Sequence, residues 1–194
     1  MRFNLANKSV TLLELLLAVA LMSLVVLGFT SIDIFSRQNV VASDRRARIQ
    51  NTVAFCMAHM SKYIGNAMGS KNNPPLTVPD TVNGESGIKI RVDTNNNGRL
   101  DASTLDKQIA YSYNSTTYQL KFYGNFTDAS TTSEILSDKI VTDLSATNIG
   151  YNNATNYVTV KITGRWTPSD ANVTPENPEV TMYTNVVMPG VSVN

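Results

Sequence analysis

The feature that most constrains this chain is an apolar run near its N-terminus, from Val10 to Thr30. As an α-helix rising about 1.5 Å per residue, a run of this length would span roughly 31 Å, close to the hydrocarbon thickness of a bilayer. The run contains no proline, and its one charged residue is Glu14. A lone carboxylate inside a span is costly and usually marks a functional pairing. The run therefore predicts a transmembrane helix with a functional glutamate near its start.

The residues before the run, 1–9, are mostly polar and carry Arg2 and Lys8 without any acidic residue. Positive charge of this kind favours the cytoplasmic side of a membrane. A secretory signal peptide would have an apolar core of about 7–15 residues and then a small-x-small cleavage site. The run here is longer, holds Glu14 and lacks a clear site of that kind. A signal peptide or an ordinary signal anchor is therefore the less favoured alternative.

The junction between these two segments resembles the type IV pilin and pseudopilin family. The signature of that family is a short basic leader, then G-F-T-L-x-E, then an apolar helix. The corresponding residues here are Ser9-Val10-Thr11-Leu12-Leu13-Glu14. The Thr, the Leu and the Glu match in type and spacing, whereas Ser replaces Gly and Val replaces Phe. The resemblance covers about thirty residues and is specific, because few segments place one Glu at this point of a span.

The resemblance implies a subunit that is processed and then assembled. A prepilin peptidase would cut between Ser9 and Val10 and methylate the new N-terminus at Val10. Glu14 would pair with the Val10 amine of a neighbouring subunit. The implied location is the bacterial inner membrane, single-pass with the C-terminal head outside the cytoplasm, and then a pilus or pseudopilus. The implied partners are other pilin or pseudopilin subunits, the prepilin peptidase, the inner-membrane assembly platform and membrane lipid.

Helical periodicity continues beyond the apolar run. Apolar residues recur every three or four positions and mark one face of an amphipathic helix; they are Ile49, Val53, Met57, Met60, Ile64 and Met68. Gly69-Ser70, followed by Pro74-Pro75, predicts the end of the helix. Cys56 and His59 could in principle share a metal. Because no second pair of ligands exists, they are better interpreted as a core cysteine and a histidine at the edge of the core.

The rest of the chain predicts a β-rich head. Residues 70–86 are rich in Pro, Asn and Gly and predict a loop. Alternating apolar and polar residues predict strands at 88–92, 107–113, 117–123, 157–163 and 179–188, whereas 134–144 has no assignable pattern. The predicted fold class is α+β, with the helix covering an antiparallel sheet, the architecture that the pilin resemblance implies. The predicted segments are a cleaved leader (1–9), a transmembrane half-helix (10–30), an amphipathic half-helix (31–69) and a globular head (70–194).

The segment Asp93-Thr94-Asn95-Asn96-Asn97-Gly98-Arg99-Leu100-Asp101 matches the start of a calcium loop. Such loops place oxygen ligands at positions one, three, five and nine, a glycine at six and a backbone carbonyl at seven. The candidate ligands are Asp93, Asn95, Asn97, Arg99 through its carbonyl, Asp101, and Asp106 in place of a glutamate at position twelve. The alternative is an Asn-Gly hairpin loop whose side chains cap their own backbone. An Asp/Asn-Gly loop between strands also resembles minor subunits of the PilW or PulJ type.

Other functional classes find little support. The net charge of +1, without a basic stripe, predicts no nucleic-acid partner. With one Cys, one His and no G-x-S-x-G or phosphate loop, the chain is predicted not to be an enzyme and to need no cofactor other than the candidate calcium. The leading hypothesis is a structural subunit of a type IV pilus or of the type II secretion pseudopilus, in a minor, priming or tip position. The alternative is an uncleaved, membrane-anchored extracytoplasmic binding domain, with calcium as one candidate ligand.

Overall fold

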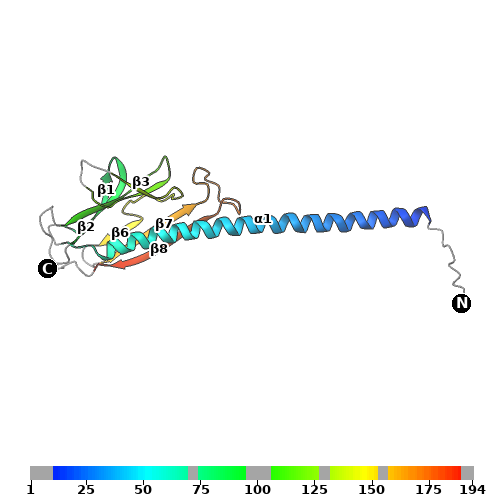
Figure 1. Cartoon of the computed structure of the whole chain (residues 1–194), viewed down its shortest axis with the longest axis horizontal. Helices are drawn as coiled ribbons and strands as arrows, with labels where there is room; N and C mark the ends of the chain where they lie inside the picture. Colours follow the sequence, from blue (N-terminus) through cyan, green and yellow to red (C-terminus); the bar gives the residue numbers. More distant parts are fainter. Residues whose placement is uncertain (1–10, 70–73, 95–105, 127–131, 153–156, 189–194) are drawn as a thin grey trace. The chain divides into compact units, whose positions relative to one another are not determined.

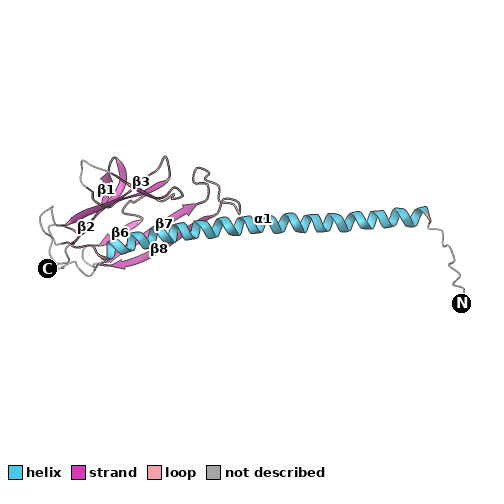
Figure 2. Cartoon of the chain, in the orientation of Figure 1, coloured by secondary structure: helices cyan, strands magenta, loops and turns pink. Residues whose placement is uncertain are grey.

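A computed structural model of the chain describes residues 11–69, 74–94, 106–126, 132–152 and 157–188 (Figure 1). An N-terminal helix is followed by antiparallel strands, which confirms the α+β class (Figure 2). The elements are α1 (Leu12–Gly65), β1 (Leu76–Val82), β2 (Glu85–Val92), β3 (Lys107–Asn114), β4 (Gln119–Tyr123), β5 (Glu134–Ser137), β6 (Ile149–Asn152), β7 (Tyr157–Arg165) and β8 (Glu179–Val187). The chain divides into two compact units, Met1–Val41 and Ala42–Asn194.

The strands of the second unit form two antiparallel sheets. The first has the order β1-β2-β3-β4-β5 and the second the order β6-β7-β8, so neighbours in each sheet are also neighbours in sequence. The predicted antiparallel pairing is therefore confirmed, although the strands form two sheets and not one. The register places Ile90 on β2 between Leu76 on β1 and Ile109 on β3. All three side chains are buried, as expected when the alternation of a strand puts its apolar side chains on one face.

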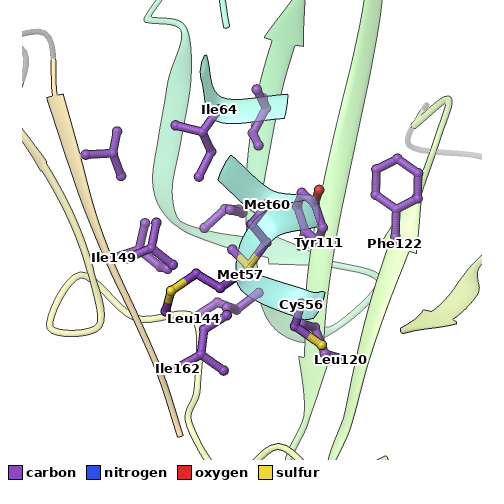
Figure 3. Close-up of a cluster of buried hydrophobic side chains, with 14 of the residues drawn as sticks. Cys56, Met57, Met60, Ile64, Tyr111, Leu120, Phe122, Leu144, Ile149 and Ile162 are labelled. Carbon is purple, nitrogen blue, oxygen red and sulfur yellow. The ribbon is translucent and has the colours of Figure 1, made fainter. Parts of the chain in front are cut away.

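The buried face of α1 packs against both sheets. Six side chains of this face are buried, namely Ile49, Val53, Cys56, Met57, Met60 and Ile64. The close-up places Cys56 on the side of Leu120, from β4, and Met57 on the side of Ile162, from β7 (Figure 3). The predicted apolar stripe is confirmed, except that Met68 is only half-buried. One helical face thus supplies a core that the two sheets share.

β7 approaches α1 closely enough to require a glycine. A Cβ atom added at Gly164 would lie 2.6 Å from Cγ2 of Val53 and 3.3 Å from Cγ2 of Ile49. A contact of 2.6 Å between carbon atoms essentially never occurs in native proteins, whose cores are already packed as closely as organic crystals. The absent side chain therefore sets the distance between this strand and the helix.

The end of α1 differs from the prediction. The helix was expected to continue to Met68 and instead ends at Gly65. Beyond it, the amide of Met68 donates to the carbonyl of Arg91 (3.0 Å), and Ala67 forms an isolated bridge with Val92. Pairing with the end of β2 satisfies these backbone groups, and so the chain leaves the helix earlier than the spacing of its apolar residues suggests.

The prediction that residues 70–86 form a loop is wrong for most of that segment. β1 occupies Leu76–Val82 at the edge of the five-stranded sheet and contains Pro79. Its register with β2 shifts between Thr77 and Asp80. A proline is tolerated in an edge strand or at a bulge, because the amide it lacks is not needed there. β5 and β6, each four residues long, also lack a predicted counterpart.

The connection between β5 and β6 joins the two sheets. The amide of Ile140 donates to the carbonyl of Tyr118 (3.2 Å) in the β3–β4 turn, whereas the amide of Val141 donates to the carbonyl of Thr163 (2.9 Å) on β7. Ile140 and Leu144 are buried in the shared core. Backbone hydrogen bonds and buried side chains therefore fix this connection against both sheets.

Candidate functional site

The helix α1 starts in a capping box made by Thr11 and Glu14. The amide of Glu14 donates to Oγ1 of Thr11 (3.3 Å), and the amide and hydroxyl of Thr11 both donate to Oε2 of Glu14 (3.1 Å each). In such a box the two side chains satisfy amides at the helix start that have no partner within the helix. The helix therefore begins at Leu12 because the T-x-x-E spacing closes its first turn.

The capping box uses only part of the Glu14 carboxylate. Both bonds from Thr11 reach Oε2, and no hydrogen bond to Oε1 is found within the described residues. Glu14 is exposed, and the partial positive charge of a helix N-terminus stabilises a carboxylate there. A positioned carboxylate with one oxygen available can bind a cation such as a primary amine.

The surface of α1 in the first unit is largely apolar, with charged residues at Glu14, Asp33 and Arg37. Large apolar side chains are exposed throughout, including Leu12, Leu16, Leu21, Leu24, Leu27, Phe29, Ile32 and Phe35. The helix is long and apolar enough to cross a membrane. An 18-residue stretch of it has a mean hydropathy of 2.6, and none of that stretch is buried within the protein. Exposed apolar surface on this scale marks contact with lipid or with other protein. The prediction of a membrane-spanning segment thus agrees with the length and exposure of this helix.

The hydroxyl groups within the apolar segment bond to their own helix. Ser23 donates to the carbonyl of Ala20 (2.7 Å), and Thr30 and Ser31 donate to the carbonyl of Leu27 (2.9 and 2.8 Å). Polar groups without a partner are expensive in hydrocarbon, and a bond to a preceding carbonyl removes much of that cost. These three residues are therefore compatible with a lipid environment.

The predicted cleavage and methylation residues, Ser9 and Val10, lie outside the described residues, as do the candidate calcium ligands Asn95, Asn97, Arg99 and Asp101. Both ends of the candidate calcium loop are described. Asp93 is 8% exposed, and Oδ1 of Asp106 accepts a hydrogen bond from the amide of Thr94 (3.3 Å). This hydrogen bond brings the two ends of the segment together, and each end carries a carboxylate, Asp93 and Asp106. These ends fit a calcium loop and an Asn-Gly hairpin alike, so calcium binding stays a prediction.

The prediction that Cys56 and His59 are core residues is confirmed. Burial raises the pKa of the Cys56 thiol to about 12, so the thiol stays protonated. His59 lies at the edge of the core. Its Nδ1 is 3.0 Å from the hydroxyl oxygen of Tyr111, and its ring centroid is 4.7 Å from the ring centroid of Phe122. Within the residues that the structure describes, no group of three or more His, Cys, Asp or Glu side chains could hold a metal ion.

The capping role of Thr11 was not predicted from the sequence. The T-x-x-E spacing of the capping box was readable, but Thr11 and Glu14 were both assigned to the family motif alone. Comparison with protein-family models, with curated proteins and with solved structures finds no match for this chain. The resemblance to pilins therefore depends on the residues around Ser9 to Glu14, and the function is argued from the helix itself.

Proposed function

We propose that this chain is a structural subunit of a type IV pilus or of the type II secretion pseudopilus, assembled after its leader is removed. The observation that carries the proposal is the exposed apolar surface of α1 in the first unit, with the Glu14 carboxylate held at its start. Such a helix needs lipid around it in a single subunit and can exchange that lipid for other helices in a filament. The β-rich second unit would then be the head of a pilin-like fold.

The capping box suggests how Glu14 would serve assembly. Cleavage after Ser9 would create an amine at Val10, next to the capping residue Thr11. Oε2 of Glu14 accepts the bonds from Thr11, whereas Oε1 accepts none from a described residue and would be available for the Val10 amine of a neighbouring subunit. The attraction between these charges would grow as water and headgroups are excluded, and pairing would offset the cost of a carboxylate in the bundle.

A minor position in the filament fits the chain better than a major one. The single cysteine leaves no intrachain disulfide, and the Asp/Asn-Gly sequence Asp93–Asp101 stands between β2 and β3 along the chain. Both features resemble minor subunits that prime assembly or cap the tip. The expected partners are other pilin or pseudopilin subunits, the prepilin peptidase, the assembly platform of the inner membrane and lipid.

The charge of Glu14 can be tested apart from its role in the capping box. Glutamine also serves at the third helical position of such boxes, so Glu14→Gln keeps the cap and removes the charge. We expect Glu14→Gln and Glu14→Leu to insert in the membrane and to be cleaved, but to lose crosslinking to other pilins in native membranes. The matched control is Asp33→Asn, which removes a carboxylate paired with Arg37 on the same helix. Normal crosslinking of both Glu14 variants would contradict the assembly role.

The second candidate is a membrane-anchored binding domain that keeps its leader. Its support is the same apolar helix, which would then act only as an anchor, and the candidate calcium loop from Asp93 to Asp106. The two candidates differ in the N-terminus of the mature protein, because only the pilin proposal requires cleavage after Ser9.

A further inference from the structure

A polar groove lies in the second unit where the tips of two hairpins meet the connection between the sheets. It consists of two adjoining hollows of about 440 and 370 Å³. Both are lined by Tyr113 and Ser115 from the β3–β4 hairpin and by Asp143 from the β5–β6 connection. Volumes of about 300–1,000 Å³ are typical of sites for small ligands.

The walls of this groove are fixed by the fold. Asp143 stands between Thr142 and Leu144, and both of these side chains are buried. Oγ1 of Thr142 accepts a hydrogen bond from the amide of Thr163 on β7 (2.7 Å). In the β3–β4 turn, Oδ1 of Asn114 accepts from the amides of Thr116 and Thr117 (2.9 Å each). A site held in this way loses little conformational entropy when a ligand binds.

Several polar atoms line the groove and have no hydrogen-bond partner among the residues that the structure describes. Oδ1 of Asp143 accepts hydrogen bonds from the side chains of Ser145 (2.9 Å) and Asn148 (2.6 Å), but no bond to its Oδ2 is found in the described part of the chain. Tyr113 is only 6% exposed, yet its hydroxyl makes no hydrogen bond to any described residue. Lys161 adds an exposed ammonium group. Acceptors and donors therefore lie around one space.

The charges around the groove favour a neutral ligand. The carboxylate of Glu85 is paired with Lys121 (2.7 Å), and that of Glu179 is paired with Arg165. Two other charged side chains line the groove, Asp143 and Lys161, and neither forms an ion pair with a described residue. Their formal charges are opposite. A strongly anionic or cationic ligand would meet one of them as a like charge.

We propose that this groove binds a neutral saccharide through Asp143, Tyr113 and Lys161. Each sugar hydroxyl both donates and accepts, so it can donate to Oδ2 of Asp143 or to the phenol oxygen and accept from the ammonium group. A polar peptide fits less well, because Val141 is the one aliphatic side chain among the described lining residues and peptides usually need apolar anchors or an open strand edge. This inference is independent of filament assembly.

The test uses the full chain in phospholipid nanodiscs that contain no glycolipid. Saturation-transfer NMR is recorded with glucose, galactose, mannose and N-acetylglucosamine, each at about 10 mM, a concentration that detects millimolar affinity. The variants are Asp143→Asn and Tyr113→Phe, each of which changes one polar group. The control is Asp138→Asn, which removes an exposed carboxylate outside the groove. Thermal unfolding of each variant shows whether the head is intact.

We expect at least one sugar to give saturation transfer with the wild type and the control, and each groove variant to bind it about tenfold more weakly or worse, as expected for losing a hydrogen bond to a ligand. Because two variants alter different elements, one remains informative if the other unfolds. If no sugar receives saturation from the wild-type protein, the proposal is overturned, and so it is if a sugar does and neither variant changes its signal. Binding of the peptide Gly-Ser-Asn-Thr with the same dependence on Asp143, and of no sugar, would assign the groove to peptides instead.

Discussion

His59 shows how one side chain at the edge of the core can make stability depend on pH. Its ring lies among Phe55, Tyr63, Tyr111 and Phe122. Burial lowers the pKa of His59 below its ordinary value of 6.5, the charge of Lys62 lowers it further, and Glu134 partly opposes the shift. The folded state therefore binds this proton less readily than the unfolded state does.

The sign of the effect follows from this difference in proton binding. Between the lowered pKa of the folded state and about 6.5, the unfolded chain binds more protons, so the free energy of unfolding rises with pH in that window and falls as the pH drops. His59 is the single histidine of the chain. We expect His59→Gln to flatten the pH dependence of the urea midpoint between about pH 5 and pH 7. An unchanged slope in this variant would contradict the assignment to His59.

The predicted calcium site can also be tested at single residues. If the loop from Asp93 to Asp106 binds calcium, millimolar calcium should raise the Tm of the full chain, because a ligand that binds only the folded state stabilises it. A Kd weaker than about 10⁻⁴ M is expected from so few carboxylates. Asp93→Ala should abolish the shift, whereas Asp138→Asn should retain it. A Tm that calcium leaves unchanged in the wild type would favour the Asn-Gly hairpin.

Among the elements, the crossing of α1 and β7 offers the sharpest test of the packing. Gly164→Ala would bring a methyl group to 2.6 Å from Val53, whereas Gly150→Ala on β6 would meet only ordinary contacts, the nearest at 3.7 Å. We expect Gly164→Ala to lower the free energy of unfolding by about 1–3 kcal/mol, the usual cost of overpacking. Gly150→Ala should change it by about 0.5 kcal/mol or less. Equal effects in chemical denaturation would show that β7 does not approach the helix as described.

The elements also show what the sequence could predict. The alternation of Ile109, Tyr111 and Tyr113 predicted β3, because every second residue of a strand lies on the same face and these three lie in the shared core. The sequence did not indicate that the opposite face is buried as well, where Ala110 belongs to a second cluster. β1 was missed because Pro79 and the surrounding turn-forming residues obscure an edge strand. The division into two sheets could not be predicted, since it depends on which strands pair, and the apolar face of α1 would suit one sheet or two.

The two candidate sites also differ in whether the sequence could have predicted them. The capping box of Thr11 and Glu14 depends on neighbours three positions apart, so its spacing alone could have revealed it. The groove could not be predicted, because Tyr113 and Asp143 are brought together only when a hairpin tip and a connection pack side by side. Local spacing is recorded in the sequence, whereas a surface assembled from distant segments is not.

For the whole molecule, the pilin proposal requires the apolar helix to belong to a processed subunit and not to act as a permanent anchor. The long exposed apolar surface of α1 suits both. The capping box places Glu14 one turn from the proposed cut, where a new amine would need a counter-charge. Cleavage of the leader therefore distinguishes a pilin subunit from a membrane-anchored binding domain more directly than any property of the head does.

The most direct test is mass spectrometry of the intact N-terminus, on protein taken from the membranes of its native host. We predict a mature chain that begins at Val10 and carries one added methyl group on its amine. The chain should lack the leader, residues 1–9. A mature protein that still begins at Met1 and retains Ser9 would contradict the pilin proposal and favour the membrane-anchored binding domain.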